Sequence, residues 1–263
     1  MNIPPLYANG DPQDVNDEIP PCFIRGTSTP EEARRRWQKT KEWRVAKKVD
    51  EILEIAHPNF LYIKERYPHA LHKIGSKGMY IYIERPGHGR LAEVWSAGLT
   101  LDDMEQHYTF TTEYLWRVLE PREDAQFVSV FDIDNCSMSD LTGDTFSMLK
   151  RCSQVIGQHY PERAHKIFVV NAPGWVSWIW STITPFLDPI TTKKISIIKK
   201  GKDHIKEITE FCDVQDLPPE IGGSDSIMLG HSEAEQGMLA FVKTVNEKHN
   251  VPTEVDSCRP MNK

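Results

Sequence analysis

The central part of the chain alternates apolar runs with helix-like segments, and this alternation constrains the fold more than any other feature. The runs "FVSVFDI" (127–133), "KIFVVN" (166–171) and "ISIIKK" (195–200) are short and rich in β-branched residues, which is typical of buried strands. "MYIYIE" (79–84) predicts a further strand, and residues 144–159 carry apolar side chains at helical spacing. Strands that alternate with helices predict an α/β fold with a mixed or parallel sheet flanked by helices.

The segment before the sheet reads as an extended arm followed by helices. Residues 1–30 are rich in proline and predict the arm. Thr29 and Glu32 have the spacing of a capping box, so we expect a helix to begin there. Apolar positions in the range 45–56 extend this helix at helical spacing, and we expect the arginines of residues 34–36 to lie on its solvated face.

Composition excludes several classes of protein. The chain has 263 residues, of which 39% are hydrophobic, so it can bury a sizeable core. Its formal net charge of −7 argues against a general attraction to nucleic acid. The five cysteines are odd in number and form no CxxC pair, so neither a disulfide framework nor a zinc site is expected. With no apolar leader, we expect a soluble, cytoplasmic and monomeric protein without a metal or other cofactor.

The run "NAPGWVSWIWSTITPFLDP" (171–189) concentrates three tryptophans within six residues. On a helical plot Trp175, Trp178 and Ile179 share one face, and Trp180 falls on the next. The apolar stretch is far shorter than the ~20 residues that a membrane span needs. Two interpretations stay open: a buried core helix, or a helix that covers an apolar cavity and meets a membrane.

The end of the strand "FVSVFDI" carries a second chemical motif. Asp132 and Asp134 have the Asp-x-Asp spacing with which some magnesium-dependent phosphatases present a nucleophile and a general acid. This spacing is a weak signal, and two polar residues at the end of a strand explain it better. A phosphatase that uses Asp132 therefore remains only a distant alternative.

Several motifs together resemble the CRAL-TRIO lipid-binding family, in particular its phosphatidylinositol/phosphatidylcholine transfer branch. They are "YPER" (160–163), the strand that ends in "NAP" (171–173), the aromatic helix after it, "PFLDPIT" (185–191) with "KKI", and "LPPEIGG" (217–223). The resemblance implies an α/β lobe that encloses an apolar lipid cavity, preceded by a helical lobe. We expect an arm and helical lobe over 1–68, the lipid-binding lobe over 69–229, and a C-terminal helix and tail over 230–263.

The resemblance also implies a function without covalent chemistry, namely binding phosphatidylinositol and exchanging it between membranes, with presentation to lipid kinases as a consequence. The headgroup residues that it implies are Glu162, Thr191, Lys194 and Arg25. The helix after "NAP" would be a movable gate that contacts the membrane, through Trp175, Trp178, Ile179, Trp180 and Phe186. A carrier of a sterol-like, retinoid-like or tocopherol-like ligand is the nearest alternative, although such ligands offer no phosphate to Lys194.

A second headgroup site for phosphatidylcholine is only partly retained. Tyr82 and Ser129 match hydroxyl-bearing positions that the resemblance implies, whereas Leu71 and Phe127 stand where a tyrosine and a serine would be expected. An unmet polar group in a water-poor cavity costs about 1–3 kcal/mol. We therefore expect phosphatidylinositol to be preferred over phosphatidylcholine.

Overall fold

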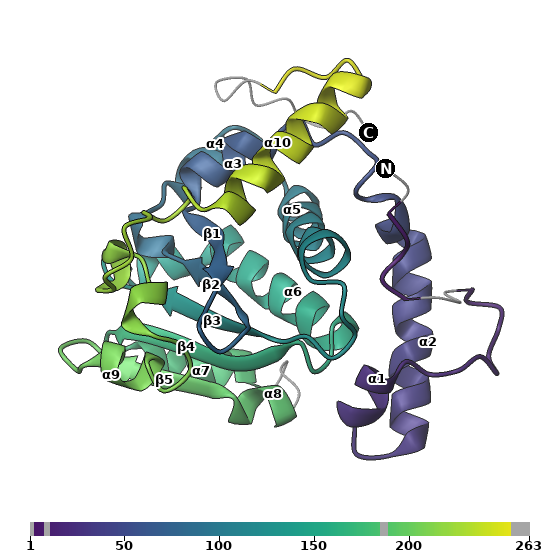
Figure 1. Cartoon of the computed structure of the whole chain (residues 1–263), viewed down its shortest axis with the longest axis horizontal. Coiled ribbons are helices and arrows are strands. Elements are labelled where there is room, and N and C mark those ends of the chain that lie inside the picture. Colours follow the sequence, from purple (N-terminus) through teal and green to yellow (C-terminus); the bar gives the residue numbers. More distant parts are fainter. Residues whose placement is uncertain (1–2, 8–10, 185–188, 254–263) are drawn as a thin grey trace.

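The computed structural model describes residues 3–7, 11–184 and 189–253. Its centre is a five-stranded mixed sheet whose strands follow one another in chain order (Figure 1). The strands are β1 (His69–Ile74), β2 (Tyr80–Glu84), β3 (Phe127–Asp132), β4 (Ala164–Ala172) and β5 (Ile195–Lys199). The predicted α/β class is confirmed, and the four strands expected from the sequence all form.

The strand β1 is the one that the sequence does not predict as a strand. It pairs antiparallel with β2, whereas β2 to β5 are parallel to one another. Its residues lack an apolar pattern because two of them, His69 and His72, are histidines that are nevertheless buried. Tertiary contacts therefore determine that this segment forms a strand, since neither its periodicity nor its composition indicates one.

Helices lie on both sides of this sheet (Figure 1). In the described residues the α-helices are α1 (Pro21–Arg25), α2 (Pro30–Ala46), α3 (Phe60–Arg66), α4 (Leu91–Ser96), α5 (Leu101–Tyr114), α6 (Gly143–His159), α7 (Val176–Ile183), α8 (Pro189–Lys193), α9 (His204–Ile208) and α10 (Glu233–Lys248). A π-helical turn, Leu115–Leu119, continues α5.

Each face of the sheet carries its own core. On one face, Ile81, Val130 and Phe168 pack beneath α9 and the segment 211–221. On the other, Tyr80 and Tyr82 pack against α5, α6 and α10. Because side chains alternate along a strand, β2 contributes to both cores, and Phe127 of β3 packs at the margin of the second one. Of these two cores, the strands β4 and β5 contribute to the first alone.

The inward face of α2 is polar, and this corrects two expectations. Arg36 was expected on a solvated face, but it is buried, and its Nε atom donates to the carbonyl oxygen of Gln158 over 2.9 Å. Arg44 is also buried and forms an ion pair of 2.8 Å with Glu113 on α5. Val45, expected in the apolar stripe, is 59% exposed. The helix ends at Ala46, so the predicted continuation over 45–56 is wrong.

The N-terminal arm is packed against the helices. The hydroxyl of Tyr7 is buried and donates to the carbonyl oxygen of His159, and Arg117 donates to the carbonyl oxygens of Ile3 and Pro4. The arm also contains the short helix α1. The prediction of an extended arm is therefore met only in part, because the arm contains α1 and contributes to a core.

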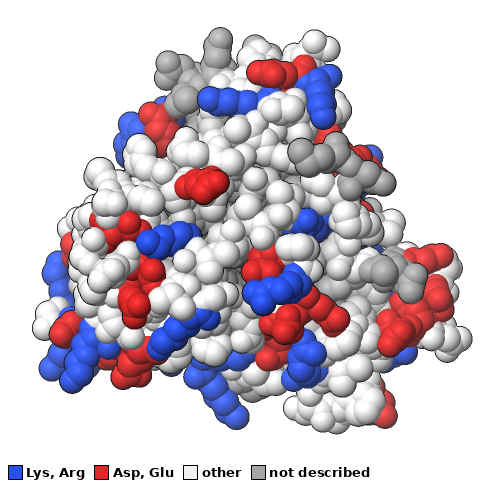
Figure 2. All heavy atoms as spheres, viewed as in Figure 1, with Lys and Arg blue, Asp and Glu red and all other residues white. Residues whose placement is uncertain are grey.

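Charges of both signs are interspersed over the face shown in Figure 2. This distribution agrees with the expectation that no general attraction to nucleic acid exists. Among the residues that the structure describes, we find no helix with the length and apolar character required to cross a bilayer.

Candidate functional site

Two of the predicted headgroup residues, Glu162 and Lys194, come together at the amino ends of neighbouring parallel strands. Glu162 lies just before β4, and Lys194 lies between α8 and the start of β5. Parallel strands begin at the same edge of a sheet, so residues far apart in the sequence become neighbours there. Gln126, just before β3, lies at the same edge, and its Nε2 atom donates to the carbonyl oxygen of Glu162 over 2.8 Å.

Lys194 and Glu162 form an ion pair at this edge. The Nζ atom of Lys194 lies 3.2 Å from one carboxylate oxygen of Glu162 and 3.3 Å from the other. The two side chains are 19% and 20% exposed, so the pair is within reach of a ligand. The N–H of Lys194 donates to the carbonyl oxygen of Thr191 in α8, and its own carbonyl oxygen accepts from Ile167, so the backbone of Lys194 is fixed on both sides.

Arg25 is exposed at the end of α1. The next residue, Gly26, packs closely against the turn that carries Glu162. A Cβ atom placed on Gly26 would lie only 2.9 Å from Cβ of Pro161, the residue before Glu162. Arg36 stabilises this close contact between Gly26 and Pro161, since its Nη1 atom donates to the carbonyl oxygen of Gly26 over 2.9 Å. The fold therefore brings Arg25 to the same side of the molecule as Glu162.

Arg163 is a residue of the "YPER" motif to which the sequence assigned no role. It is buried, and its Nη1 atom donates to the carbonyl oxygens of Arg122, Glu123 and Ala125 at 2.9–3.2 Å. Its guanidinium lies over the ring of Trp116, 4.4 Å from the centroid. These contacts fix the loop before β3 against the turn that carries Glu162.

An apolar surface extends from this edge along one face of the sheet. Residues that are paired across neighbouring strands point to the same side of the sheet. Ser129, Ile167 and Ile195 are paired in this way, so they and every second residue along their strands lie on this face. It carries a set of apolar side chains that are only partly buried or are exposed: Phe127, Phe131, Ile167, Val169, Ile195 and Ile197. The sequence predicted the strands but did not reveal that this side is less completely covered.

Tyr82 and Ser129 lie side by side on this face. They are partners in the register of β2 and β3, and Leu71 of β1 is the partner of Tyr82 on its other side. The three residues therefore form one row across the sheet. Both Tyr82 and Ser129 are buried, and burial raises the pKa of the Tyr82 phenol well above its ordinary value.

Glu84, two residues beyond Tyr82, is an acidic residue that the sequence did not single out. Its carboxyl is buried and accepts hydrogen bonds from the hydroxyls of Tyr67 and Tyr108, the latter over 2.7 Å. Burial raises the pKa of this carboxyl, although the phenols that donate to it act in the opposite direction. A polar group of this kind was not foreseeable, because its two partners, Tyr67 and Tyr108, come from separate segments.

The tryptophan-rich run forms α7, which begins beside the apolar surface. Val176 and Ile179 are buried, and Val176 packs in a cluster that includes Val169 of β4. Trp178 is 55% exposed, whereas Trp175 and Trp180 are half-buried.

Trp175, Trp178 and Ile179, which were expected to share one broad face, differ in burial, since only Ile179 is buried. Val176 and Ile179, three residues apart, form the inward side, and Trp178 points outward. Phe186, the last of the predicted gate residues, lies outside the described residues.

Asp132 is engaged in structural contacts. One carboxylate oxygen accepts from Nε of Arg85 over 3.0 Å, and the other accepts from the side-chain amide of Asn171 and the N–H of Asp134. Asp134 in turn pairs with Lys200 at 2.6 Å. The geometry thus favours the interpretation of two polar residues that close the end of β3.

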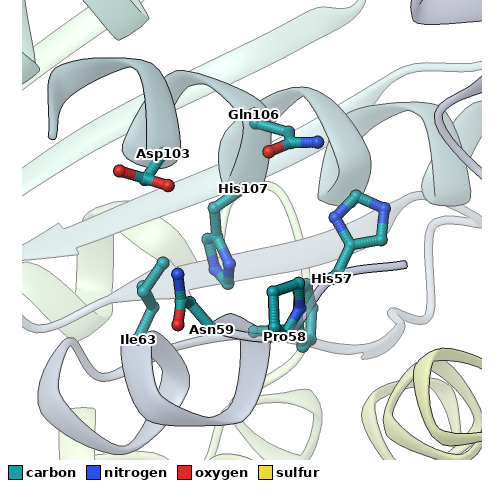
Figure 3. A pocket seen from close by; sticks show the side chains of 8 residues that line it. His57, Pro58, Asn59, Ile63, Asp103, Gln106 and His107 are labelled. Carbon is teal, nitrogen blue, oxygen red and sulfur yellow. The ribbon is translucent and has the colours of Figure 1, made fainter. Parts of the chain in front are cut away.

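A small cavity lies between α5 and the segment that leads into α3 (Figure 3). His57, Asn59, Asp103 and His107 are among the residues that line it, and its volume is about 20 Å³. The Nδ1 atom of His107 has no hydrogen-bond partner among the described residues. The cavity has room for about one water molecule, so it is far too small for any part of a lipid.

Comparison with known proteins identifies the fold family. The family model described as the CRAL/TRIO domain matches residues 64–223. The crystal structure of Sfh5 superposes with a TM-score of 0.58 at 17% sequence identity, covering 81% of this chain and 78% of that one. This likeness concerns the fold alone.

Two curated relatives illustrate the similarity in sequence. The chain is 26% identical over 201 residues to "Phosphatidylinositol/phosphatidylcholine transfer protein SFH7" of Arabidopsis thaliana, covering 73% of this chain and 36% of the relative. It is 29% identical over 214 residues to "SEC14 cytosolic factor" of Eremothecium gossypii, covering 78% and 67%. The chain spans about a third to a half of the length of the plant relatives.

Proposed function

Because this chain belongs to the CRAL/TRIO domain family, we propose that it binds phosphatidylinositol and exchanges it between membranes. Relatives at 26–28% identity carry names that describe phosphatidylinositol/phosphatidylcholine transfer, which supports this class of ligand. Phosphatidylcholine is a second, less favoured ligand in this proposal, and no covalent chemistry or cofactor is involved.

The pair of Lys194 and Glu162 is the observation that carries the proposal. A phosphatidylinositol headgroup joins an anionic phosphate to a ring of hydroxyls, so it needs a cation and an acceptor close together. Lys194 supplies the cation and Glu162 the acceptor, with their charged atoms 3.2 Å apart. In the proposal the hydroxyl of Thr191 donates to the phosphate, and Arg25 adds a second cation. Charge-assisted hydrogen bonds of this kind contribute about 1.5–3 kcal/mol each.

The apolar surface beside the pair suits the acyl chains. A two-chain phospholipid that crosses water exposes roughly 30 methylene or methyl groups, which costs on the order of 20 kcal/mol. The side chains from Phe127 to Ile197 on this face offer an apolar environment that continues from the headgroup site. Protein-mediated exchange avoids most of that cost, provided that the protein touches the membrane while the chains move.

We assign this membrane contact to α7. Its inward residues, Val176 and Ile179, keep it on the lobe, and Trp178 presents an indole to the outside. Indole rings favour the membrane interface because they combine an apolar body with one N–H donor. The protein would then be cytoplasmic and only transiently bound to membranes, and the exchange would present inositol lipid to lipid kinases.

Mass spectrometry of the lipids that copurify with the protein tests the ligand. We expect phosphatidylinositol to be enriched over its share in the host membranes. Transfer of labelled phosphatidylinositol and phosphatidylcholine between vesicles tests the exchange. A protein that carries only a sterol, retinoid or tocopherol, and that accelerates neither phospholipid, would contradict the proposal.

A further inference from the structure

Glu162 has a backbone conformation that only a few per cent of non-glycine residues adopt. Its φ angle is 61°, in the left-handed region. Such a conformation costs energy and persists where the surrounding contacts over-determine it, which happens most often at binding and active sites. The contacts that hold Glu162 in place are therefore candidates for a functional role.

The side chain of Gln126 makes the most direct of these contacts. Its Nε2 atom donates to the carbonyl oxygen of Glu162 over 2.8 Å, and its Oε1 atom lies 3.0 Å from Nδ1 of His165. The amide is therefore held at both ends, which also fixes its orientation. Next to it, the N–H of Phe127 donates to the carbonyl oxygen of Arg163 over 3.0 Å, so the start of β3 holds the peptides on both sides of this turn.

Fixing this backbone also fixes where the carboxylate of Glu162 can lie. With φ at 61°, both carboxylate oxygens lie within 3.3 Å of Nζ of Lys194. If the backbone relaxed into an ordinary conformation, the Cα–Cβ bond would point elsewhere. Among the described residues, the side-chain hydrogen bonds of Gln126 go to Glu162 and His165 and not to Lys194, so any effect of Gln126 on the headgroup site passes through Glu162.

We infer that Gln126 is a positioning residue that sets the preference for a hydroxyl-rich phosphate headgroup over a choline phosphate headgroup. This inference rests on the proposed function. An inositol ring needs the Glu162 carboxylate as an acceptor, whereas a choline group has no hydroxyl to donate. A displaced carboxylate should therefore weaken binding of phosphatidylinositol and leave phosphatidylcholine unaffected. The sequence offered no sign of this role, because Gln126 belongs to no motif.

The substitution Gln126→Met tests the inference, since it keeps the length of the side chain and removes the donor. We expect transfer of phosphatidylinositol between vesicles to fall roughly three- to tenfold, as loss of one neutral hydrogen bond would give. Transfer of phosphatidylcholine by the same variant should not change. Gln126→Glu, which also lacks the donor, should act in the same direction.

Gln236 provides a matched control at a distant place. Its Nε2 atom also donates to a backbone carbonyl oxygen, that of Gly230, over 2.7 Å. Gln236→Met should leave transfer of both lipids unchanged. In the double variant Gln126→Met/Glu162→Gln, the loss should not exceed that of Glu162→Gln alone, because both changes remove the same interaction.

Two outcomes would overturn the inference. One is an unchanged ratio of phosphatidylinositol to phosphatidylcholine transfer in Gln126→Met, including an equal loss of both lipids. The other needs no lipid: a crystal structure of the ligand-free Gln126→Met protein in which Glu162 keeps its left-handed conformation beside Lys194. A wild-type protein that transfers no phosphatidylinositol would instead refute the proposed function, and the crystal structure would still decide the role of Gln126.

Discussion

Replacing Lys194 by methionine separates the stability of the fold from the affinity for the ligand. The substitution keeps most of the side chain's length and removes its charge. In the structure that charge pairs with Glu162 at 3.2 Å, with about a fifth of each side chain exposed. Partly exposed ion pairs contribute about 0–1 kcal/mol to stability because water screens them. The folded protein should therefore tolerate the change.

The effect on the ligand should be much larger. A phosphate bound by Lys194 loses a charge-assisted hydrogen bond, and Glu162 is left as an unpaired anion beside it. Loss of about 1.5–3 kcal/mol corresponds to a roughly ten- to hundredfold decrease in affinity. The repulsion between the phosphate and Glu162 acts in the same direction. Lipid binding should thus fall by more than the stability of the protein does.

Vesicle-to-vesicle transfer of labelled phosphatidylinositol measures this effect, and urea denaturation measures the stability. Lys193→Met is the matched control, since Lys193 is the preceding residue, is exposed and lies at the end of α8. We expect Lys193→Met to transfer lipid as the wild type does. If a Lys194→Met protein of unchanged stability also transferred phosphatidylinositol at the wild-type rate, the assignment of the phosphate site would be refuted.

Three further predictions follow from α7 and from the buried charges. Quenching of tryptophan fluorescence by brominated lipids should decrease in Trp178→Phe, and equal quenching in the variant and the wild type would exclude contact of Trp178 with the bilayer. Arg44→Met should lower the free energy of unfolding by about 3 kcal/mol, because the fully buried Glu113 loses its main partner; urea denaturation measures this, and Arg44→Met/Glu113→Gln should recover part of the loss. Burial lowers the pKa of His57 from 6.5 to about 4, so the unfolded chain takes up this proton first and stability should fall as the pH drops from 6.5 to 4, by at most about 3 kcal/mol. The fall should be smaller in His57→Gln, and equal pH dependence in both proteins would contradict this assignment.

The sequence predicted the parallel part of the sheet well, because those strands carry apolar side chains on both sides. A strand such as β3 must be apolar along most of its length, so it is visible in the sequence without any knowledge of its neighbours. The edge strand β1 was not predicted, since its buried positions include His69 and His72. Their burial depends on partners in other segments, such as His107 for His69 and Asp225 for His72.

The helix α2 shows the same limit of prediction from sequence. Its inward residues include Arg36, Lys41 and Arg44, which hydrophobic periodicity assigns to the solvent. Each of them is buried because another segment supplies an acceptor for its hydrogen bonds, as Glu113 does for Arg44. An acceptor that lies dozens of residues away leaves no local signal, so the orientation of the helix could not be predicted.

The resemblance alone names the proposed headgroup residues, but it does not reveal their neighbourhood. Glu162, Thr191 and Lys194 belong to motifs, and the order of the parallel strands brings those motifs together. Gln126 reaches Glu162 only because β3 and β4 begin at the same edge of the sheet. Its role becomes visible only when the backbone conformation of Glu162 and the hydrogen bond of 2.8 Å are considered together.

The tryptophan-rich run can now be understood from the two sides of α7. If the run were only a core helix, the largest side chain would be expected to point inward, since burying it excludes the most water. The structure instead buries Val176 and Ile179 and exposes Trp178. The smaller residues are sufficient to hold the helix on the lobe, and in the proposed function the outward indole is the group that contacts the membrane interface. A helix that covers a lipid needs apolar residues on both its inner and its outer side. The inner side then faces the lipid when the helix is closed, and the outer side faces the bilayer when the protein is bound to a membrane.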